Sequence, residues 1–196
     1  MSVLGIELLR ILLLVLVTTN FVGFAWAIHS LFGRSERMPL AMRSLSVAGA
    51  MFAAWHIFEI ATVRLHVTAA LIGAALYSAT LALFWWSVPY ARRAKLALAF
   101  TTSTSTTLLD YGPYGWVRHP FYASYLLYWI SGIVATENLW LLLSAAIMSY
   151  FYINAIVREE AELLARPDIA NYVAYRARTG CLLPRWGAWK RDYTQD

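Results

Sequence analysis

Long apolar stretches separated by short, arginine-rich polar segments make up most of the 196-residue chain. A helix needs about 20 mostly apolar residues to cross the hydrocarbon core of a bilayer. Five stretches approach or reach that length, at residues 11–33, 44–63, 65–91, 120–136 and 138–157. The pattern predicts an all-α fold, a polytopic membrane helical bundle with about five transmembrane helices. Only Glu137 and its neighbours separate the last two stretches, so these should form a C-terminal helical hairpin, followed by a short cytosolic helical tail.

The basic residues are unevenly distributed among the segments that join these stretches. Of the 16 Lys and Arg residues, all but Arg10 and Arg64 lie between the first and second stretches, between the third and fourth, or after the fifth. Because basic loops stay in the cytosol, we expect an N-terminus outside and a C-terminus in the cytosol. We expect one membrane domain over residues 1–196, with three spans in residues 1–99 and the remainder in residues 100–196.

Composition agrees with a membrane location. The chain is 60% hydrophobic and 14% charged, against roughly 45–50% apolar and 25% charged in soluble domains. This excludes a disordered chain and argues against a water-soluble globule. A net charge of +5 in such a chain reports orientation rather than nucleic-acid binding, so the lipid bilayer is the expected partner. The single cysteine, Cys181, excludes an intrachain disulfide and a multi-cysteine zinc site, and we expect no bound metal.

Turn-forming and aromatic residues stand immediately before the fourth apolar stretch. Gly112 and Pro113 favour a turn, and Pro120 suits the first position of a helix. Arg118 and His119 should therefore lie beside free backbone N–H groups and the positive end of the helix dipole, which together attract anions. Three aromatic residues would wall this corner: Tyr114, Trp116 and Tyr122. The alternative is an ordinary interfacial anchor belt with an extended arginine.

Two adjacent carboxylates, Glu159 and Glu160, follow the fifth stretch. Negative charge at the C-terminal end of a helix opposes the helix dipole. The pair could bind a cation or a ligand rich in hydroxyl groups. Alternatively the segment is a solvated continuation of the helix, in which Arg158 pairs with Glu162 four residues on.

The second stretch carries two ionisable residues, His56 and Glu59, three positions apart. Ionisable residues within a membrane span are functional candidates by default, so substrate binding is one interpretation of this pair. The equal alternative is a hydrogen-bonded pair that fixes helix packing.

Five short motifs occur in a fixed order in the second half of the chain. They are Gly112-Pro113-Tyr114, Arg118-His119-Pro120-Phe121-Tyr122, Glu159-Glu160-Ala161-Glu162-Leu163, Tyr172-Val173-Ala174-Tyr175 and Pro184. This ordered set resembles the isoprenylcysteine carboxyl methyltransferase and phospholipid methyltransferase family over about residues 100–185. The first three apolar stretches resemble that family only in being apolar.

The resemblance implies an enzyme that transfers a methyl group from S-adenosylmethionine at the cytosolic membrane face. The acceptor would be lipophilic, with a carboxylate or an amine, such as a lipid or a prenylcysteine-like molecule. The implied cofactor-binding residues are Thr107, Leu108, Leu109, Tyr114, His119, Pro120, Tyr122, Glu159 and Glu160. The catalytic candidates are Arg118, Glu159, Asn154 and Arg158. Asn154 and Arg158 are included among the catalytic candidates because they lie near Ala155, where eukaryotic members of the family carry an arginine for the substrate carboxylate.

Two other classes of protein remain open from the sequence. One is an NADPH-dependent membrane sterol or steroid reductase of related fold, which would call for extra basic residues to hold the 2′-phosphate. The other is a non-catalytic membrane protein that binds a lipid.

Overall fold

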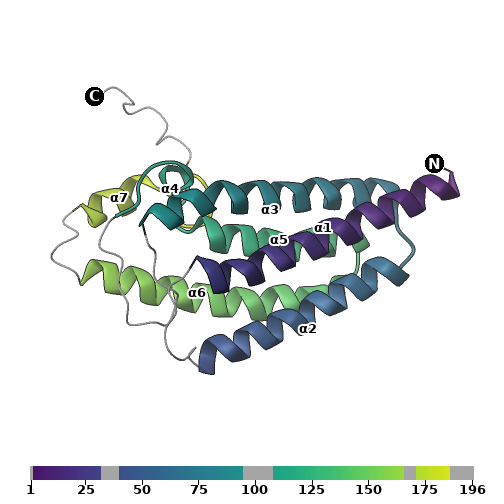
Figure 1. The fold of residues 1–196 in the computed structure, drawn as a ribbon, viewed down its shortest axis with the longest axis horizontal. Helices are drawn as coiled ribbons and strands as arrows, with labels where there is room; N and C mark the ends of the chain where they lie inside the picture. The colour runs from purple at the N-terminus through teal and green to yellow at the C-terminus, as the bar shows by residue number, and fades with distance from the viewer. Residues whose placement is uncertain (1, 32–39, 95–107, 166–170, 186–196) are drawn as a thin grey trace.

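The structure is a computed structural model that describes residues 2–31, 40–94, 108–165 and 171–185. Over these residues the fold is all-helical and contains no strand, as predicted. Figure 1 shows the long helices lying side by side, with α4 and α7 at the end of the bundle opposite the start of α1. The elements are α1 (Val3–Ser30), α2 (Leu40–Thr62), α3 (Val67–Ala94), α4 (Pro113–Trp116), α5 (Pro120–Thr136), the 3₁₀ helix η1 (Leu139–Leu141), α6 (Leu142–Leu164) and α7 (Tyr172–Arg178).

Among the described residues, four helical segments are long and apolar enough to cross a membrane. They are Val3–Ile28, Arg43–Thr62, Val67–Arg93 and Leu139–Leu164. Large apolar side chains remain exposed on them, among them Leu8, Met51 and Ile153. Such extensive exposed apolar surface is typical of contact with lipid. These four helices confirm the prediction of a helical membrane protein. Helix α5, at 17 residues, is shorter than these four segments.

The first helix begins earlier than the apolar pattern predicts. The Ser2 hydroxyl accepts a hydrogen bond from the Gly5 amide at 3.3 Å and so caps the start of α1. Arg10 then lies inside the helix, where its Nη1 donates to the carbonyls of Ile60 (2.6 Å) and Val63 (3.0 Å) at the end of α2. The last carbonyls of a helix lack partners within the helix, so this arginine satisfies two of them.

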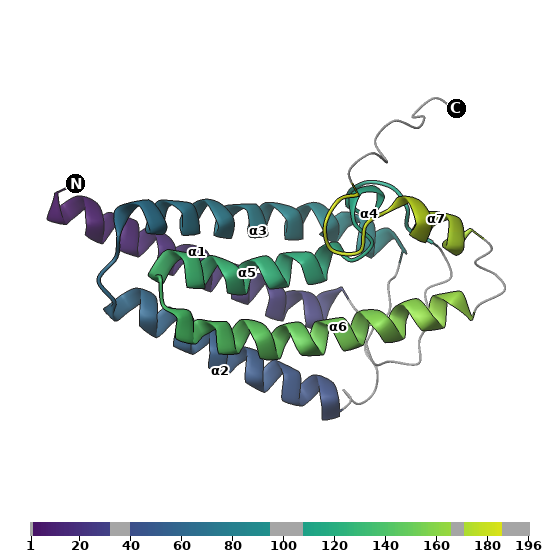
Figure 2. The ribbon, with the colours of Figure 1, turned by 180° about the vertical axis from the view of Figure 1, so that it is seen from behind.

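Helix α5 lies inside the bundle, against α3 and α6, with further contacts to α1 and α2. Its approach to α3 is close at Gly73, where an added Cβ would lie 2.4 Å from the Cβ of Ala135. Tyr77 and Phe84 of α3 and Tyr128 of α5 are fully buried between the helices. In the view of Figure 2, α5 runs between α3 and α6 along the length of the bundle.

One end of the bundle carries the short elements and the predicted motifs. Gly112 precedes α4 with φ of +61°, and a Cβ there would lie 2.3 Å from the ring of Tyr90. Glycine is suited to this backbone conformation and to the close approach of the ring. An isolated parallel bridge pairs Val117 with Gly180, which joins the segment before α5 to the segment after α7. The start of α5 and the end of α6 meet at this same end (Figure 2).

Candidate functional site

The chain turns sharply into α5 beside the C-terminal segment. Pro120 occupies the first turn of α5 and His119 is the residue before it, with non-helical φ and ψ. The Arg118 amide donates to the carbonyl of Gly180 at 2.8 Å, and the His119 amide donates to the carbonyl of Cys181 at 3.1 Å. The backbone after α7 therefore fixes the two residues whose side chains face α6.

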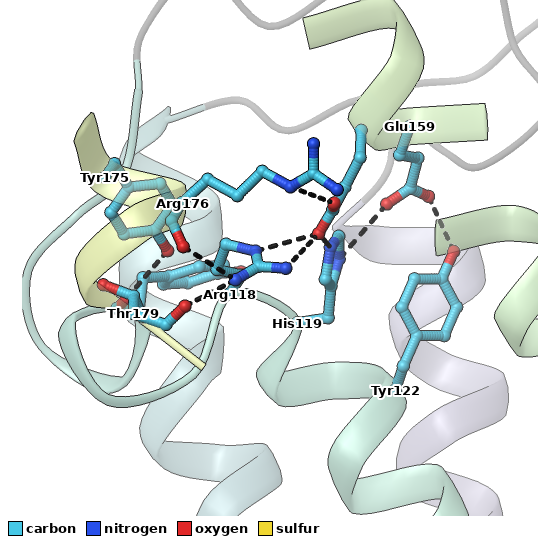
Figure 3. Close-up of polar contacts among 9 residues, drawn as sticks. Arg118, His119, Tyr122, Glu159, Tyr175, Arg176 and Thr179 are labelled. Carbon is cyan, nitrogen blue, oxygen red and sulfur yellow. Dashed lines mark hydrogen bonds and ion pairs between the residues drawn. The ribbon is translucent and has the colours of Figure 1, made fainter. Parts of the chain in front are cut away.

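Glu160 is the centre of the polar network drawn in Figure 3. Its Oε1 accepts from Nε and Nη2 of Arg118, both at 2.8 Å, and lies 3.2 Å from Nε2 of His119. Its Oε2 lies 3.2 Å from Nε of Arg176. The Glu160 side chain is 9% exposed. This carboxylate thus ties α6 to the start of α5 and to α7.

Arg118 completes the attachment of the C-terminal segment. Its Nη1 donates to the carbonyls of Thr179 at 2.5 Å and Arg176 at 3.3 Å. The side chain is 11% exposed. Its donors are engaged by a carboxylate and two carbonyls, an arrangement that suits anchoring.

Glu159 has a different environment from its neighbour. Its Oε1 accepts from the hydroxyl of Tyr122 at 2.6 Å, and its Oε2 lies 3.6 Å from Nδ1 of His119. The side chain is 33% exposed. A carboxylate has about four acceptor positions, so Glu159 keeps acceptor capacity for a ligand.

Three tyrosine rings pack together next to this carboxylate. The ring of Tyr152 lies 5.7 Å from that of Tyr122 and 5.6 Å from that of Tyr125, and the latter two are 6.2 Å apart. Figure 3 shows Tyr122 rising from α5 toward Glu159. The sequence interpretation missed Tyr125 and Tyr152. Their spacing was the available signal, since Tyr125 is three residues after Tyr122 and Tyr152 is seven before Glu159, which places each on the same helix face as its partner.

Tyr114 of α4 is buried near the network. Its carbonyl accepts from the hydroxyl of Tyr175 at 2.7 Å. Its own hydroxyl has no hydrogen-bond partner among the described residues. Burial raises the pKa of Tyr114 well above that of an ordinary tyrosine, so this hydroxyl keeps its proton and remains a donor.

Of the remaining predicted cofactor-binding residues, two lie within the described part of the chain and one does not. Leu108 packs against the buried pair Tyr172 and Tyr175, and Leu109 is buried. Thr107 lies outside the described residues.

Two predicted catalytic residues lie on the outer part of α6. The Asn154 side-chain amide donates to the carbonyl of Tyr150 one turn earlier, at 2.7 Å. The Asn154 side chain therefore bonds to its own helix. Arg158 is exposed.

The predicted substrate residues His56 and Glu59 have separate partners. His56 Nε2 lies 2.8 Å from the Ser144 hydroxyl, whereas Glu59 accepts from the indole N–H of Trp55 at 3.0 Å. His56 is fully buried. Both residues lie in the second half of α2 (Leu40–Thr62), whose end is at the opposite end of the bundle from the end of α6 (Figure 1).

Among the described residues, one group at the site brings potential metal-ligating atoms close together. One ligand atom each from His119, Glu160 and Cys181 lies within 4.8 Å of the others. Arg118 and Arg176 already pair with this glutamate, and their positive charges oppose a cation there. Burial also raises the pKa of the Cys181 thiol, which disfavours the thiolate that binds metals. The absence of a bound metal stays a prediction.

Comparison with protein-family models, curated proteins and solved structures found no match to this chain.

Proposed function

We propose that the protein is an integral membrane methyltransferase that moves a methyl group from S-adenosylmethionine to a lipophilic acceptor. The acceptor group would be a carboxylate or an amine, carried by a lipid or a prenylcysteine-like molecule. The observation that carries the proposal is the Glu159 carboxylate, held by Tyr122 at 2.6 Å and bordered by the rings of Tyr125 and Tyr152. Tyr122 and Glu159 belong to two of the ordered motifs that resemble the methyltransferase family.

The chemistry of the cofactor fits the donors and acceptors of the site. S-adenosylmethionine carries a sulfonium and an ammonium, and cations bind to carboxylates and to the faces of aromatic rings. Glu159 keeps acceptor capacity, and Tyr122, Tyr125 and Tyr152 present aromatic surface beside it. The Tyr114 hydroxyl is a buried donor without a partner among the described residues, which suits a hydroxyl or carboxylate oxygen of the cofactor.

The two glutamates would have different tasks. Glu160 is saturated by Arg118, Arg176 and His119 and would position the wall of the site without touching the cofactor. Glu159 would contact the cofactor directly. This division narrows the sequence-based expectation, which assigned both carboxylates to cofactor binding and Arg118 to catalysis.

The bound cofactor would supply the electrophilic methyl group. The protein's part is to hold donor and acceptor in line, because alignment supplies much of the rate acceleration in such a transfer. Tyr122 fixes the rotamer of Glu159, and His119 lies between the two carboxylates at 3.2 Å and 3.6 Å. Exclusion of water by the tyrosine rings would strengthen the attraction between Glu159 and a cation.

The membrane topology that we propose rests on the distribution of the basic residues and on the length of α5. At 1.5 Å per residue, the 17 residues of α5 span about 26 Å, close to the roughly 30 Å of the hydrocarbon core. We therefore include α5 as a crossing, which gives five crossings and a hairpin of α5 with α6. The distribution of basic residues favours an N-terminus outside, with the site and α7 at the cytosolic face.

Equilibrium binding to the purified full-length protein in lipid nanodiscs tests the proposal. We expect S-adenosylmethionine to bind and the Glu159→Gln variant to bind it about 10- to 100-fold more weakly, as expected for a charged hydrogen bond. Glu162→Gln is the matched control, because Glu162 is exposed on the same helix and should leave affinity unchanged. Binding of NADPH in place of S-adenosylmethionine would favour the reductase and contradict the proposal.

A further inference from the structure

A second polar cluster lies deep in the bundle, apart from the site around Glu159. The Nδ1 atom of His56 and the hydroxyls of Tyr77 and Tyr128 have no hydrogen-bond partner among the described residues. All three side chains are fully buried. Buried polar atoms without partners are costly, and inside a membrane span such groups mark functional positions.

The hydrogen bonds of Ser144 determine which nitrogen of His56 carries the proton. The Ser144 hydroxyl donates its only proton to the carbonyl of Leu141, at 2.7 Å. His56 Nε2, 2.8 Å from the same hydroxyl oxygen, must therefore be the donor in that contact. A neutral imidazole with a proton on Nε2 leaves Nδ1 as a bare acceptor.

Gly132 of α5 brings this acceptor and a hydroxyl to one place. A Cβ at Gly132 would lie 2.0 Å from His56 Nδ1 and 2.8 Å from the Tyr77 hydroxyl oxygen. The two polar atoms are therefore no more than about 4.8 Å apart, the sum of these distances. That limit fits a single oxygen atom bridging both, at ordinary hydrogen-bond lengths.

We propose that His56 and Tyr77 bind one hydroxyl group at Gly132, from water or from a lipophilic alcohol that enters from the membrane. The guest must donate, because Nδ1 only accepts, and its oxygen must accept, because the Tyr77 hydroxyl has a proton to give. A hydroxyl does both, whereas a ketone or a carboxylate cannot donate and an ammonium cannot accept.

The surroundings of the cluster suit the apolar body of such an alcohol. The His56 ring lies 5.2 Å from Trp129 and 6.2 Å from Tyr128, so aromatic rings flank the polar atoms. Apolar walls with a few convergent polar groups are typical of small-molecule sites. Gly132 is 12 residues beyond Pro120, about 18 Å along α5. The site is thus separate from Glu159, and the inference stands without the methyltransferase proposal.

Nuclear magnetic resonance of the full chain in lipid nanodiscs, with ¹⁵N-labelled histidine, tests the inference. The spectrum of a His56→Gln variant assigns the His56 signals by difference. We expect a proton on Nε2, none on Nδ1, and a through-space contact from the His56 ring to the guest. A contact to the water signal identifies water, whereas a contact that appears only with 1-dodecanol, and not with its methyl ether, identifies an alcohol.

Two variants separate binding from a merely structural role. Tyr77→Phe removes one of the two hydrogen bonds, so the water contact should be lost or the dodecanol affinity should fall about tenfold. Tyr150→Phe, on the exposed face of α6, is the matched control and should change neither. Gly132→Ala would place its methyl carbon 2.0 Å from His56 Nδ1 and 2.8 Å from the Tyr77 hydroxyl oxygen, which displaces these side chains and should abolish the contact. If that variant does not fold, Tyr77→Phe decides the question.

Three results would overturn the inference. The first is a proton on Nδ1 of His56. The second is a direct hydrogen bond from the Tyr77 hydroxyl to Nδ1 with no guest signal. The third is a contact from the His56 ring to the methyl ether as strong as its contact to 1-dodecanol.

Discussion

Removing the Glu160 carboxylate should weaken the docking of α7 on the bundle. The side chains of Glu160 and Arg118 are 9% and 11% exposed, so they form a buried pair, whose disruption costs about 3–5 kcal/mol. Arg118 would keep the carbonyls of Thr179 and Arg176, which favours the lower end of that range. Arg176 is 48% exposed, so its own pairing adds less than about 1 kcal/mol. We therefore expect Glu160→Ala to cost about 3 kcal/mol in the docking of α7.

Limited trypsin digestion in detergent measures this docking. Helix α7 contains Arg176 and Arg178, and trypsin should cut there when the helix detaches. Where opening and closing are fast, the cleavage rate follows the population of the open form. A cost of about 3 kcal/mol corresponds to cleavage roughly 100-fold faster than in the unmodified protein.

The matched control for this prediction is Glu162→Ala, which removes an exposed carboxylate two residues further along α6. It should leave the cleavage rate within about twofold. If Glu160→Ala also left the rate within about twofold, the carboxylate would not hold α7, and the division of roles between the two glutamates would be refuted.

Three further predictions follow from contacts elsewhere in the molecule. Tyr122→Phe keeps the ring but removes the 2.6 Å bond to Glu159, so S-adenosylmethionine should bind about tenfold more weakly in equilibrium binding, from the loss of roughly 1–1.5 kcal/mol. Gly73→Ala would place a Cβ 2.4 Å from the Cβ and 2.7 Å from the Cα of Ala135, and forcing α3 away from α5 should cost about 1–3 kcal/mol, seen as a lower midpoint of thermal unfolding. The raised pKa of Cys181 should keep its thiol protonated at neutral pH, so alkylation by iodoacetamide should be slower than for a free thiol and should accelerate only at higher pH.

Each of these predictions has a control. Gly49→Ala is the control for Gly73, because its added Cβ would meet only the flexible end of Met148 at 3.6 Å, and equal losses in the two variants would contradict the packing argument. Tyr150→Phe should leave cofactor binding unchanged. Unfolded protein is the reference for Cys181, and alkylation at the same rate in folded and unfolded protein would show that the thiol is not shielded.

The long apolar stretches predicted the helices well because their length and composition reflect lipid contact directly. The fourth stretch, residues 120–136, coincides with α5 (Pro120–Thr136), because Pro120 suits a helix start and Glu137 follows in a left-handed conformation. The predicted start of the first helix was wrong by several residues, because the charged Arg10 interrupts the apolar stretch that begins at residue 11, whereas α1 begins at Val3. Only the folded bundle supplies the carbonyls of α2 that accept from this arginine.

The candidate site was partly predictable from the motifs. Arg118, His119 and Tyr122 do meet the two glutamates, as their shared place at one end of the bundle suggested. The sequence could not distinguish Glu159 from Glu160, because adjacent residues on a helix point about 100° apart and only the packing of α5 and α7 decides what each one faces. Ser144 and Gly132, the neighbours of His56, were likewise not predictable, since both come from other helices.

The most direct test of the central claim is transfer of a radiolabelled methyl group from S-adenosylmethionine into a membrane lipid extract, with the full-length protein in nanodiscs. We expect label in the organic phase with the unmodified protein and with Glu162→Gln, and at least tenfold less label with Glu159→Gln. Label no greater than in protein-free nanodiscs, or transfer that Glu159→Gln leaves unchanged, would contradict it.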